Sequence, residues 1–343
     1  MGFDSMGDFY MMRAAIIGFG TISGTHIEAI NTNPGMELAA ICDIKAELAD
    51  RVPDGVAFYT DYKQMCREIS PDVVHICLPH YLHYPVTKDV VEMGFNVFCE
   101  KPVALNLEEA QAFAALEAAH PEVRIGICLQ NRMNDTTIEL KKILDSGEYG
   151  RILGVRGFVP WYRDRSYYEA GPWRGIMQYA GGGCMINQAL HTLDLLYYLG
   201  GDIARIHAVV GQTNDLGVEV EGDVVARLEY ASGARGLFFA TTNNWDNESV
   251  QIRVACEKGV FQIEGEKLYR ILPGGEQEMI VVAQRRDGAK FYYGSSHARL
   301  IARFYKAVET GSDDYIHVCD AVMVMRLIEA IVKSSKENRL LDV

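Results

Sequence analysis

The stretch GFGTISGTH, residues 18–26, decides the fold of this chain of 343 residues. It follows the apolar run AAII and leads into a helical pattern. Gly18 permits a sharp turn after a strand, Gly20 lets a pyrophosphate approach the backbone, and Ser23 is small enough for the third position of the motif. A helix N-terminus at this point offers free N–H groups to phosphates. The stretch therefore predicts a dinucleotide site formed by Gly18, Phe19, Gly20, Thr21 and Ile22.

Asp43 ends the second apolar run, ELAAIC, where a dinucleotide-binding fold carries an acid. Such an acid accepts hydrogen bonds from the adenosine ribose and repels a 2′-phosphate. The pattern thus favours NAD over NADP, although the charge of Lys45 would offset part of this repulsion. The alternative is a plain glycine turn with a solvent-facing Asp43.

Apolar runs and helical patterns alternate through the first third of the chain. The runs are continuous, as in parallel strands that are buried on both faces: RAAIIG, ELAAICD, VAFYT, DVVHICLP, NVFCEKP and VRIGICLQNR. Repeated strand–helix units predict an α/β fold with a doubly wound parallel sheet. We assign residues 12–132 to this dinucleotide-binding domain.

The pattern changes after about residue 150. A strand, ILGVRGFVP, is followed by an aromatic and basic loop and by a helix expected over residues 183–199. Partly alternating segments with glycine turns then predict a largely antiparallel sheet: ARIHAVV, DVVARLEY, ARGLFFATT, SVQIRVAC and GVFQIEG. Two helices close the chain, near residues 296–309 and 318–335. We assign residues 133–343 to a second, α+β domain for substrate binding and oligomerisation, whose last helices can pack back on the first domain.

Composition and charge narrow the class of protein. The formal net charge of −13 argues against binding to nucleic acid or to an anionic membrane surface, whereas a small anionic substrate stays possible because a local site can differ in sign. No apolar run is long enough to span a membrane, and the acidic start MGFDSMGDFYMM does not resemble a signal peptide. The eight cysteines form no CxxC pair, so we expect reduced thiols in a cytoplasmic protein, with no zinc site and no disulfide framework.

The first stretch that could carry chemistry is Glu100-Lys101-Pro102, at the end of the fifth predicted strand. Ligands of open parallel sheets bind at the carboxyl ends of the strands, so Lys101 should point into the cofactor crevice. Partial burial would lower its pKa and make it a usable proton donor or acceptor. The alternative is a surface ion pair between Lys101 and Glu100 before a proline turn.

The second stretch is GGGCMINQALHTLDLLYYLGG, residues 181–201. On one continuous helix, Asn187, His191 and Asp194 would share a face among apolar neighbours. A polar stripe on a buried helix needs partners, either within the protein or from a ligand. The alternative is a core histidine that is hydrogen-bonded to Asp194.

The loop WYRDRSYYEAGPWRG, residues 161–175, is the candidate substrate site. Sugars bind to aromatic faces and to fixed hydrogen-bond donors. The loop offers both, in Trp161, Tyr162, Arg163, Trp173 and Arg174. A packed loop between domains or a subunit contact would explain the same composition.

Taken together, these motifs resemble the Gfo/Idh/MocA family, which includes glucose–fructose oxidoreductase and inositol dehydrogenase. The resemblance rests on GFGTISGTH, on LPHYLH, on EKP, on GGG…NQALHTLD, and on the endings SHARLIARFYKAVETG and IEAIVKSSKENR. It implies a Rossmann domain and a second domain built on a large open, mostly antiparallel sheet. It also implies a bound nicotinamide dinucleotide and a sugar or cyclitol substrate between the domains.

The resemblance also implies roles for single residues. Lys101 and His191 match the catalytic lysine and histidine of the family, and Asn187 stands where many of its polyol dehydrogenases carry an Asp. Asn can hydrogen-bond a hydroxyl but cannot take its proton, so Lys101 and His191 must move the proton. Further cofactor contacts are implied at Leu78, Pro79, His80, His83, Glu100, Lys101 and Gln130.

The leading hypothesis is an NAD-dependent oxidoreductase that transfers a hydride between nicotinamide and a secondary alcohol of a sugar, glycoside or cyclitol. One alternative keeps NAD bound and breaks a glycosidic bond with no net redox change. Another is a non-catalytic regulator that senses NAD or a sugar. We also expect a homodimer or homotetramer, because the strand ARGLFFATT is apolar enough to seek a partner.

Overall fold

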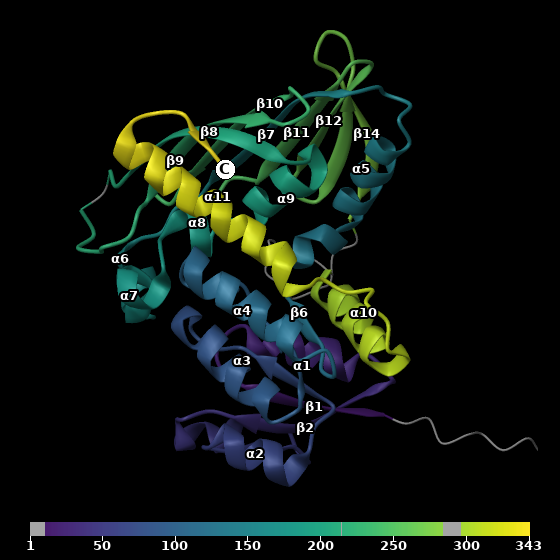
Figure 1. The fold of residues 1–343 in the computed structure, drawn as a ribbon, viewed down its shortest axis with the longest axis vertical. Helices are drawn as coiled ribbons and strands as arrows, with labels where there is room; N and C mark the ends of the chain where they lie inside the picture. Colours follow the sequence, from purple (N-terminus) through teal and green to yellow (C-terminus); the bar gives the residue numbers. More distant parts are fainter. Residues whose placement is uncertain (1–10, 214, 284–295) are drawn as a thin grey trace, which may run out of the picture.

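Two sheets organise the chain in the computed structural model, which describes residues 11–213, 215–283 and 296–343 (Figure 1). The first sheet has six parallel strands in the order β3-β2-β1-β4-β5-β6. Its strands are β1 (Met12–Ile17), β2 (Met36–Cys42), β3 (Ala57–Tyr59), β4 (Val73–Ile76), β5 (Asn96–Cys99) and β6 (Ile125–Ile127). Each coincides with one of the apolar runs of the sequence, and the predicted doubly wound sheet is confirmed.

Short helices connect these strands and cover the sheet, which is why β1 and β4 are almost entirely buried. They are α1 (Ser23–Asn31), η1 (Ala46–Arg51), α2 (Tyr62–Ile69), η2 (His80–Leu82), α3 (His83–Glu92) and α4 (Leu107–Ala119). The strand order reverses between β1 and β4. Ligands of such sheets bind in the crevice at this point, outside the carboxyl ends of the strands.

The second sheet has nine strands in the order β14-β13-β12-β11-β7-β10-β9-β8-β15. They are β7 (Ile152–Pro160), β8 (Ile203–Gly211), β9 (Asp223–Tyr230), β10 (Arg235–Thr241), β11 (Gln251–Cys256), β12 (Gly259–Glu264), β13 (Lys267–Ile271), β14 (Gln277–Val282) and β15 (Leu341–Asp342). All neighbours are antiparallel except β7 and β10. The predicted mostly antiparallel sheet is confirmed. The sequence analysis did not predict β13, β14 and β15, because these strands are short or largely exposed at the edges of the sheet.

Helices bind the two sheets together. α9 (Leu190–Gly200) packs on β7, where a side chain larger than that of Gly157 would meet Thr192 at 2.6 Å. α10 (Ser296–Thr310) packs against α1 of the first sheet, and α11 (Val318–Glu337) contacts both β8 and α4 (Figure 1). The remaining helices are η3 (Gln130–Met133), α5 (Asp135–Asp145), α6 (Arg165–Glu169), η4 (Pro172–Gly175), α7 (Met177–Ala180) and α8 (Cys184–Asn187).

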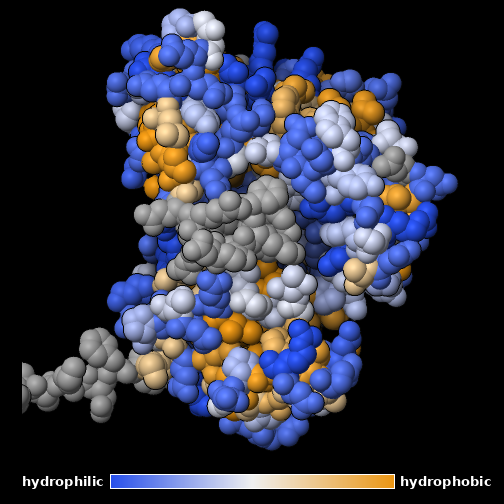
Figure 2. All heavy atoms as spheres, turned by 180° about the vertical axis from the view of Figure 1, so that it is seen from behind, coloured by the Kyte–Doolittle hydropathy of each residue, from blue (hydrophilic) through white to orange (hydrophobic). Residues whose placement is uncertain are grey.

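The surface in Figure 2 is mostly hydrophilic, with apolar side chains gathered in small patches. Within the described residues, no helix is both long enough and apolar enough to cross a membrane. Of the free cysteines that the structure describes, all except Cys319 are buried. The strand β1 begins at Met12, and residues 1–10 of the acidic start MGFDSMGDFYMM lie outside the described residues.

Candidate active site

A cavity of about 1700 Å³ opens at the carboxyl ends of the first sheet and is closed on its other side by residues of the second sheet and its helices. With the exception of Phe19 and Tyr162, every residue that the sequence singles out for a cofactor or a substrate lines this cavity. Phe19 donates its backbone N–H to Asp43 and packs its side chain against the core. Tyr162 is exposed. The fold thus brings the two predicted sets of residues to one place.

The glycine turn after β1 has the shape that a dinucleotide needs. Gly18 has a φ of +98°, and a Cβ there would lie 2.4 Å from the carbonyl oxygen of Cys77, so no larger residue fits. At Gly20 a Cβ would meet no atom within 4 Å, which leaves the backbone open to the cavity. Ser23 donates its hydroxyl to the carbonyl of Gly20 over 2.7 Å and fixes the turn as α1 begins. These residues fit a pyrophosphate at the N-terminus of α1.

Asp43 stands at the end of β2, at the edge of the same cavity. Its carboxylate accepts the backbone N–H of Phe19 over 2.8 Å and that of Lys45 over 3.0 Å. Burial, followed by the charge of Asp43, raises the pKa of the neighbouring Cys42 thiol to about 12. The two backbone donors orient Asp43 and leave room at its remaining lone pairs for a ribose diol, so the residues present fit the adenosine half of NAD.

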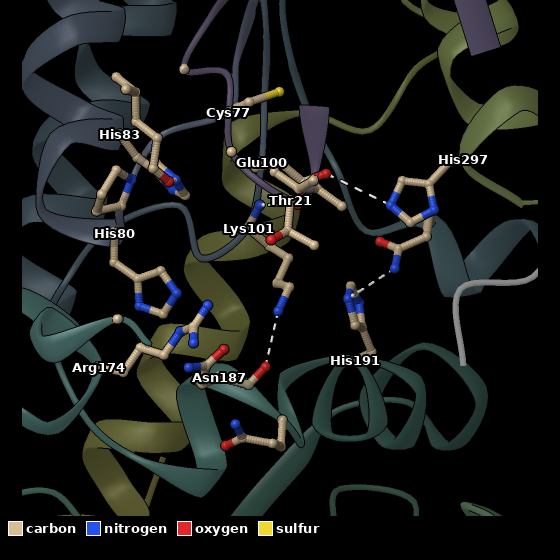
Figure 3. Close-up of a pocket in the computed structure, with 18 of the residues that line it drawn as sticks. Thr21, Cys77, His80, His83, Glu100, Lys101, Arg174, Asn187, His191 and His297 are labelled. Atoms are coloured by element: carbon tan, nitrogen blue, oxygen red, sulfur yellow. Dashed lines mark hydrogen bonds and ion pairs between the residues drawn. The ribbon is translucent and has the colours of Figure 1, made fainter. Parts of the chain in front are cut away.

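Lys101 reaches into the cavity from the end of β5, after which the Lys101–Pro102 peptide is cis. Its Nζ donates to the backbone carbonyl of Asn187 over 2.9 Å, which ties the first sheet to α8 (Figure 3). Burial lowers the pKa of the Lys101 ammonium, and the charge of Glu100 opposes this shift only in part. The amine is therefore easier to deprotonate than an exposed lysine.

Glu100 does not form the surface ion pair with Lys101 that the sequence left open. Its side chain is buried, with one carboxylate oxygen 2.9 Å from Nε2 of His26 and 3.6 Å from Nε2 of His297. Burial alone would raise the pKa of Glu100, but the hydrogen bonds and charges of these two histidines hold it well below its usual range. A buried carboxylate thus lies behind Lys101 and has its own partners.

His191 faces Lys101 from the other side of the cavity (Figure 3). Its Nε2 lies 3.1 Å from Nε2 of Gln130, and the thiol of Cys128 points at Oε1 of the same amide over 3.6 Å. Because the thiol contact places Oε1 of Gln130 toward Cys128, the amide N–H of Gln130 points at His191. Nε2 of His191 accepts this N–H, so the proton of the neutral imidazole is on Nδ1. Burial, and next the charge of Lys101, hold the pKa of His191 well below its usual range, so the ring is neutral at pH 7.

The Nδ1 of His191 is buried and has no hydrogen-bond partner among residues 11–213, 215–283 and 296–343. A buried donor without a partner costs stability, and a ligand commonly satisfies it. Since the ring lies at the wall of the cavity, a substrate oxygen is the group that would accept this N–H.

Two expectations for this segment are wrong. Asn187 ends α8, and His191 lies in the separate helix α9, because the chain leaves helical geometry at Ala189 (φ −104°, ψ 2°). Asp194 does not share a site with His191 and is not its partner; it is fully buried and bound by the guanidinium of Arg132 at 2.7 to 3.1 Å. The i, i+4, i+7 spacing placed the three side chains on one face only under the assumption of a continuous helix.

The loop over residues 161–175 forms the far wall of the cavity. Trp161 is buried and donates its indole N–H to the carbonyl of Glu248. Arg163 donates to Asn247 over 2.7 Å and stacks on Trp161 at 5.0 Å. Trp173 meets the ring of His80 edge-on at 4.6 Å. This loop therefore packs against the first domain and still presents side chains to the cavity.

His80 and His83 line the cavity on the side of the first sheet and bind backbone carbonyls. Nδ1 of His80 donates to the carbonyl of Ala180 over 2.8 Å, which joins η2 to α7. Both ring nitrogens of His83 lie 2.7 Å from backbone carbonyls, those of Pro102 and Leu78. His83 therefore braces the turn that carries Lys101.

Sequence patterns missed several residues of the site. The hydroxyl of Tyr167 accepts the side-chain amides of Asn187 and Gln188, each over 2.9 Å. Tyr167 stood in the quoted aromatic loop, which was the available signal. His26 and His297 gave none, because their partnership with Glu100 joins segments far apart in the chain.

His26, Glu100 and Cys128 also place three potential metal-ligand atoms within 4.8 Å of one another. Hydrogen bonds inside the protein already occupy these atoms: His26 with Glu100, and Cys128 with Gln130. The cluster therefore forms a buried hydrogen-bonded network, of which Glu100 lines the cavity.

Comparison with known proteins gives a consistent result. The model of the oxidoreductase family with an NAD-binding Rossmann fold, GFO/IDH/MocA, matches residues 12–126, and the model of the C-terminal domain of the same family matches residues 137–262. Inositol 2-dehydrogenase of Salmonella typhimurium is 25% identical over 258 residues, 74% of each chain. Levoglucosan dehydrogenase of Pseudarthrobacter phenanthrenivorans is 25% identical over 332 residues, 83% of each chain.

Solved structures agree with this assignment. The WlbA dehydrogenase from Bordetella pertussis, in complex with NADH and UDP-GlcNAcA, superposes with a TM-score of 0.84 at 25% identity and covers 97% of this chain and 99% of its own. Levoglucosan dehydrogenase in complex with NADH has the same fold, with a TM-score of 0.85 at 22% identity over 97% of this chain and 99% of its own. The chain therefore belongs to the Gfo/Idh/MocA family of oxidoreductases with an NAD-binding Rossmann domain.

Proposed function

We propose that this protein is an NAD-dependent dehydrogenase that interconverts a secondary alcohol of a sugar, glycoside or cyclitol with the corresponding ketone. The observation that supports this most directly is the meeting of Lys101 and His191 across a cavity that also contains the Gly18 turn and Asp43. When bound, NAD supplies the hydride acceptor. The named relatives act on inositol and levoglucosan, which fits a polyhydroxylated substrate.

The two polar groups divide the work of moving the proton. Burial lowers the pKa of Lys101, so a neutral amine is available to take the proton of the substrate hydroxyl as its carbon loses a hydride. The Nδ1–H of neutral His191 donates a hydrogen bond to the same oxygen and holds it while it becomes a carbonyl. In the reverse direction, the Lys101 ammonium returns the proton.

Asn187 contributes differently from the Asp that the family pattern places there. Its side-chain N–H is bound to the hydroxyl of Tyr167, and its backbone carbonyl holds Lys101. An amide does not titrate, so Asn187 positions the lysine and leaves the proton to Lys101.

A panel of polyols, hexoses and glycosides tests this function. Each compound is incubated with the enzyme and NAD, and both NADH absorbance and aglycone release are recorded. Lasting NADH formation with one class of compound supports the dehydrogenase. Aglycone release without net NADH would instead indicate redox-neutral glycoside cleavage, and tight binding of NAD and a sugar without turnover would indicate a sensor.

Asp43 should set the choice of cofactor. We expect NAD to bind at least about tenfold more tightly than NADP, roughly 1.4 kcal/mol, because a carboxylate held by two backbone N–H groups repels the 2′-phosphate. Asp43→Asn should narrow this preference, whereas Glu47→Gln, which removes an exposed charge nearby outside the cavity, should not. Fluorescence titration of the wild type and both variants with NAD and with NADP measures the six dissociation constants. Equal affinities in the wild type would contradict the role of Asp43.

The outer face of the second sheet suggests how copies of the chain associate. Val209, Val225, Phe239 and Phe158 are paired in register across β8, β9, β10 and β7, which makes one apolar row. Val209 is 63% exposed and Val225 is 48% exposed, while the opposite face is buried by helices. Such an exposed apolar row on one face of a sheet is suited to pairing with an identical row.

We therefore expect a homodimer or homotetramer that buries this row. Val225→Glu should shift the assembly toward a monomer, because it places a charge at the centre of the row. Val282→Glu on the distant edge strand β14 is the matched control and should leave the mass unchanged. Light scattering at micromolar concentration measures all three proteins, and a monomeric wild type would exclude this interface.

A further inference from the structure

The substrate end of the cavity collects positive charge in a chain whose net charge is −13. Lys101, Arg163 and Arg174 line it together with His80 and His191. Figure 3 shows the guanidinium of Arg174 beside His80 and Asn187, on the same side of the cavity as the amine of Lys101. Burial, the neighbouring His83, and the charges of Lys101 and Arg174 depress the pKa of His80.

Arg174 has no acidic partner in the part of the chain that the structure describes. Within the described residues, neither Arg163 nor Arg174 forms an ion pair with a carboxylate: Arg163 donates to Asn247 and to the carbonyl of Tyr162, and Arg174 donates to the carbonyl of Tyr167 over 3.0 Å. A half-buried guanidinium presents five N–H donors, and this one uses a single neutral acceptor.

The carboxylates that line the cavity near the first sheet are engaged elsewhere. Their partners are the backbone N–H groups of Phe19 and Lys45 for Asp43, Lys63 for Asp89, Lys88 for Glu92, His26 for Glu100, the Leu105 backbone N–H for Glu109, and Arg299 for Asp135. The positive charge of Arg174 is thus available to a ligand.

The structure also holds Arg174 in place. Its guanidinium lies over the ring of Tyr167 at 4.6 Å and over that of Trp173 at 5.7 Å. A Cβ at Gly171 would lie 3.0 to 3.1 Å from the guanidinium, so the glycine allows this close approach. An arginine that is already held against two aromatic rings loses little freedom when it binds an anion, and its fork matches the two oxygens of a carboxylate.

We propose that the substrate is a sugar acid, and that Arg174 binds its carboxylate while Lys101 and His191 act on a hydroxyl of the same ring. This proposal rests on the dehydrogenase function and narrows it to anionic substrates. A single unpaired guanidinium suits a monoanion better than a phosphate dianion, which favours the carboxylate. Arg163, whose donors are partly used by Asn247, adds to the attraction from the wall of the cavity.

Matched pairs of substrates test this assignment. The gluco, galacto and manno hexoses, their uronates and their 6-phosphates are compared as substrates by NADH formation. At least one uronate should have a kcat/KM about tenfold or more above that of its neutral hexose, because a charge-assisted hydrogen-bond pair is gained. A neutral hexose that is preferred in all three pairs, or a 6-phosphate that is preferred over every uronate, would overturn the proposal.

Three variants test whether Arg174 is the residue that binds the carboxylate. Arg174→Gln should lower kcat/KM for the preferred uronate by about 10- to 100-fold, mainly through KM, and should lower that of the neutral hexose much less. Gly171→Ala, which displaces the guanidinium without removing it, should raise the uronate KM severalfold. Arg165→Gln removes the same charge from the exposed part of the loop and should change neither value. If Arg174→Gln lowered kcat/KM equally for the uronate and the neutral hexose, Arg174 would not be the residue that recognises the carboxylate.

A binding measurement separates this proposal from the proposed function. Calorimetric titration of the NADH-loaded protein with each uronate needs no turnover. If no compound reduces NAD but a uronate binds the wild type and not Arg174→Gln, the dehydrogenase function fails while the anion site stands. If polyols and neutral hexoses are oxidised and no uronate binds, the function stands and the anion site is wrong.

Discussion

Lys101→Met should lower kcat for oxidation of the substrate by about a hundredfold or more, the usual scale for a general acid–base group. The variant removes the amine that takes the proton and keeps an unbranched side chain of similar length. Affinity for NAD should change little, because Gly18, Gly20 and Asp43 make the cofactor cradle. Single-turnover kinetics and fluorescence titration measure the two effects separately.

The pH dependence gives an independent check on Lys101. Burial brings its pKa below the ordinary 10.5, so the neutral amine that accepts a proton gains population as pH rises through this lowered value. Oxidation by the wild type should therefore accelerate with pH in the alkaline range and then level off. In Lys101→Met this rise should disappear, since the titrating amine is gone.

Lys101→Arg separates proton transfer from charge. The guanidinium keeps the positive charge but does not deprotonate in proteins, so this variant should be nearly as slow as Lys101→Met. His191→Ala should also be slow, but it should keep the alkaline rise because the lysine is intact. Full turnover of Lys101→Met on the true substrate would refute the catalytic role and leave Lys101 as a structural contact to Asn187.

Local patterns were sufficient to predict most of the fold. The turn at Gly18 has room for glycine alone, because a Cβ there would lie 2.4 Å from the carbonyl oxygen of Cys77. A steric requirement of this kind is visible in the sequence as a glycine. Parallel strands buried on both faces show as continuous apolar runs. The positions of Lys101 and Asp43 follow from the rule that parallel strands end at one edge, and both were predicted to reach the crevice.

Contacts between distant segments were beyond such patterns. His75 binds Tyr305 on α10 over 2.9 Å, 230 positions along the chain, and no periodicity relates them. The break between α8 and α9 at Ala189 lies in a stretch with strong helical periodicity, so a continuous helix was the natural and incorrect expectation. Asp194 was misplaced for a different reason: its partner, Arg132, lies on η3, 62 positions away in the chain.

The pair of Arg132 and Asp194 should account for a large share of the stability of the domain contact. Asp194 is fully buried and receives three contacts from the guanidinium at 2.7 to 3.1 Å, while the same guanidinium reaches Asp320 on α11 at 2.8 Å. One arginine on η3 thus ties α9 and α11 to the end of the first sheet. His191 lies on α9, three residues before Asp194. The ion pair of Asp194 with Arg132 therefore also fixes the position of His191 in the cavity.

Asp194→Ala should lower the free energy of unfolding by about 3 to 5 kcal/mol, because it leaves a buried guanidinium with its main partner removed. The double variant Asp194→Leu with Arg132→Met should recover most of this loss, since an apolar pair has no charge to desolvate. Glu257→Ala, which breaks the exposed pair with Arg151, is the control and should have a much smaller effect. Urea denaturation followed by fluorescence compares the four proteins. An Asp194→Ala variant as stable as the wild type would mean that water reaches Arg132, and the tie between the domains would then have to come from the apolar contacts of α10 and α11.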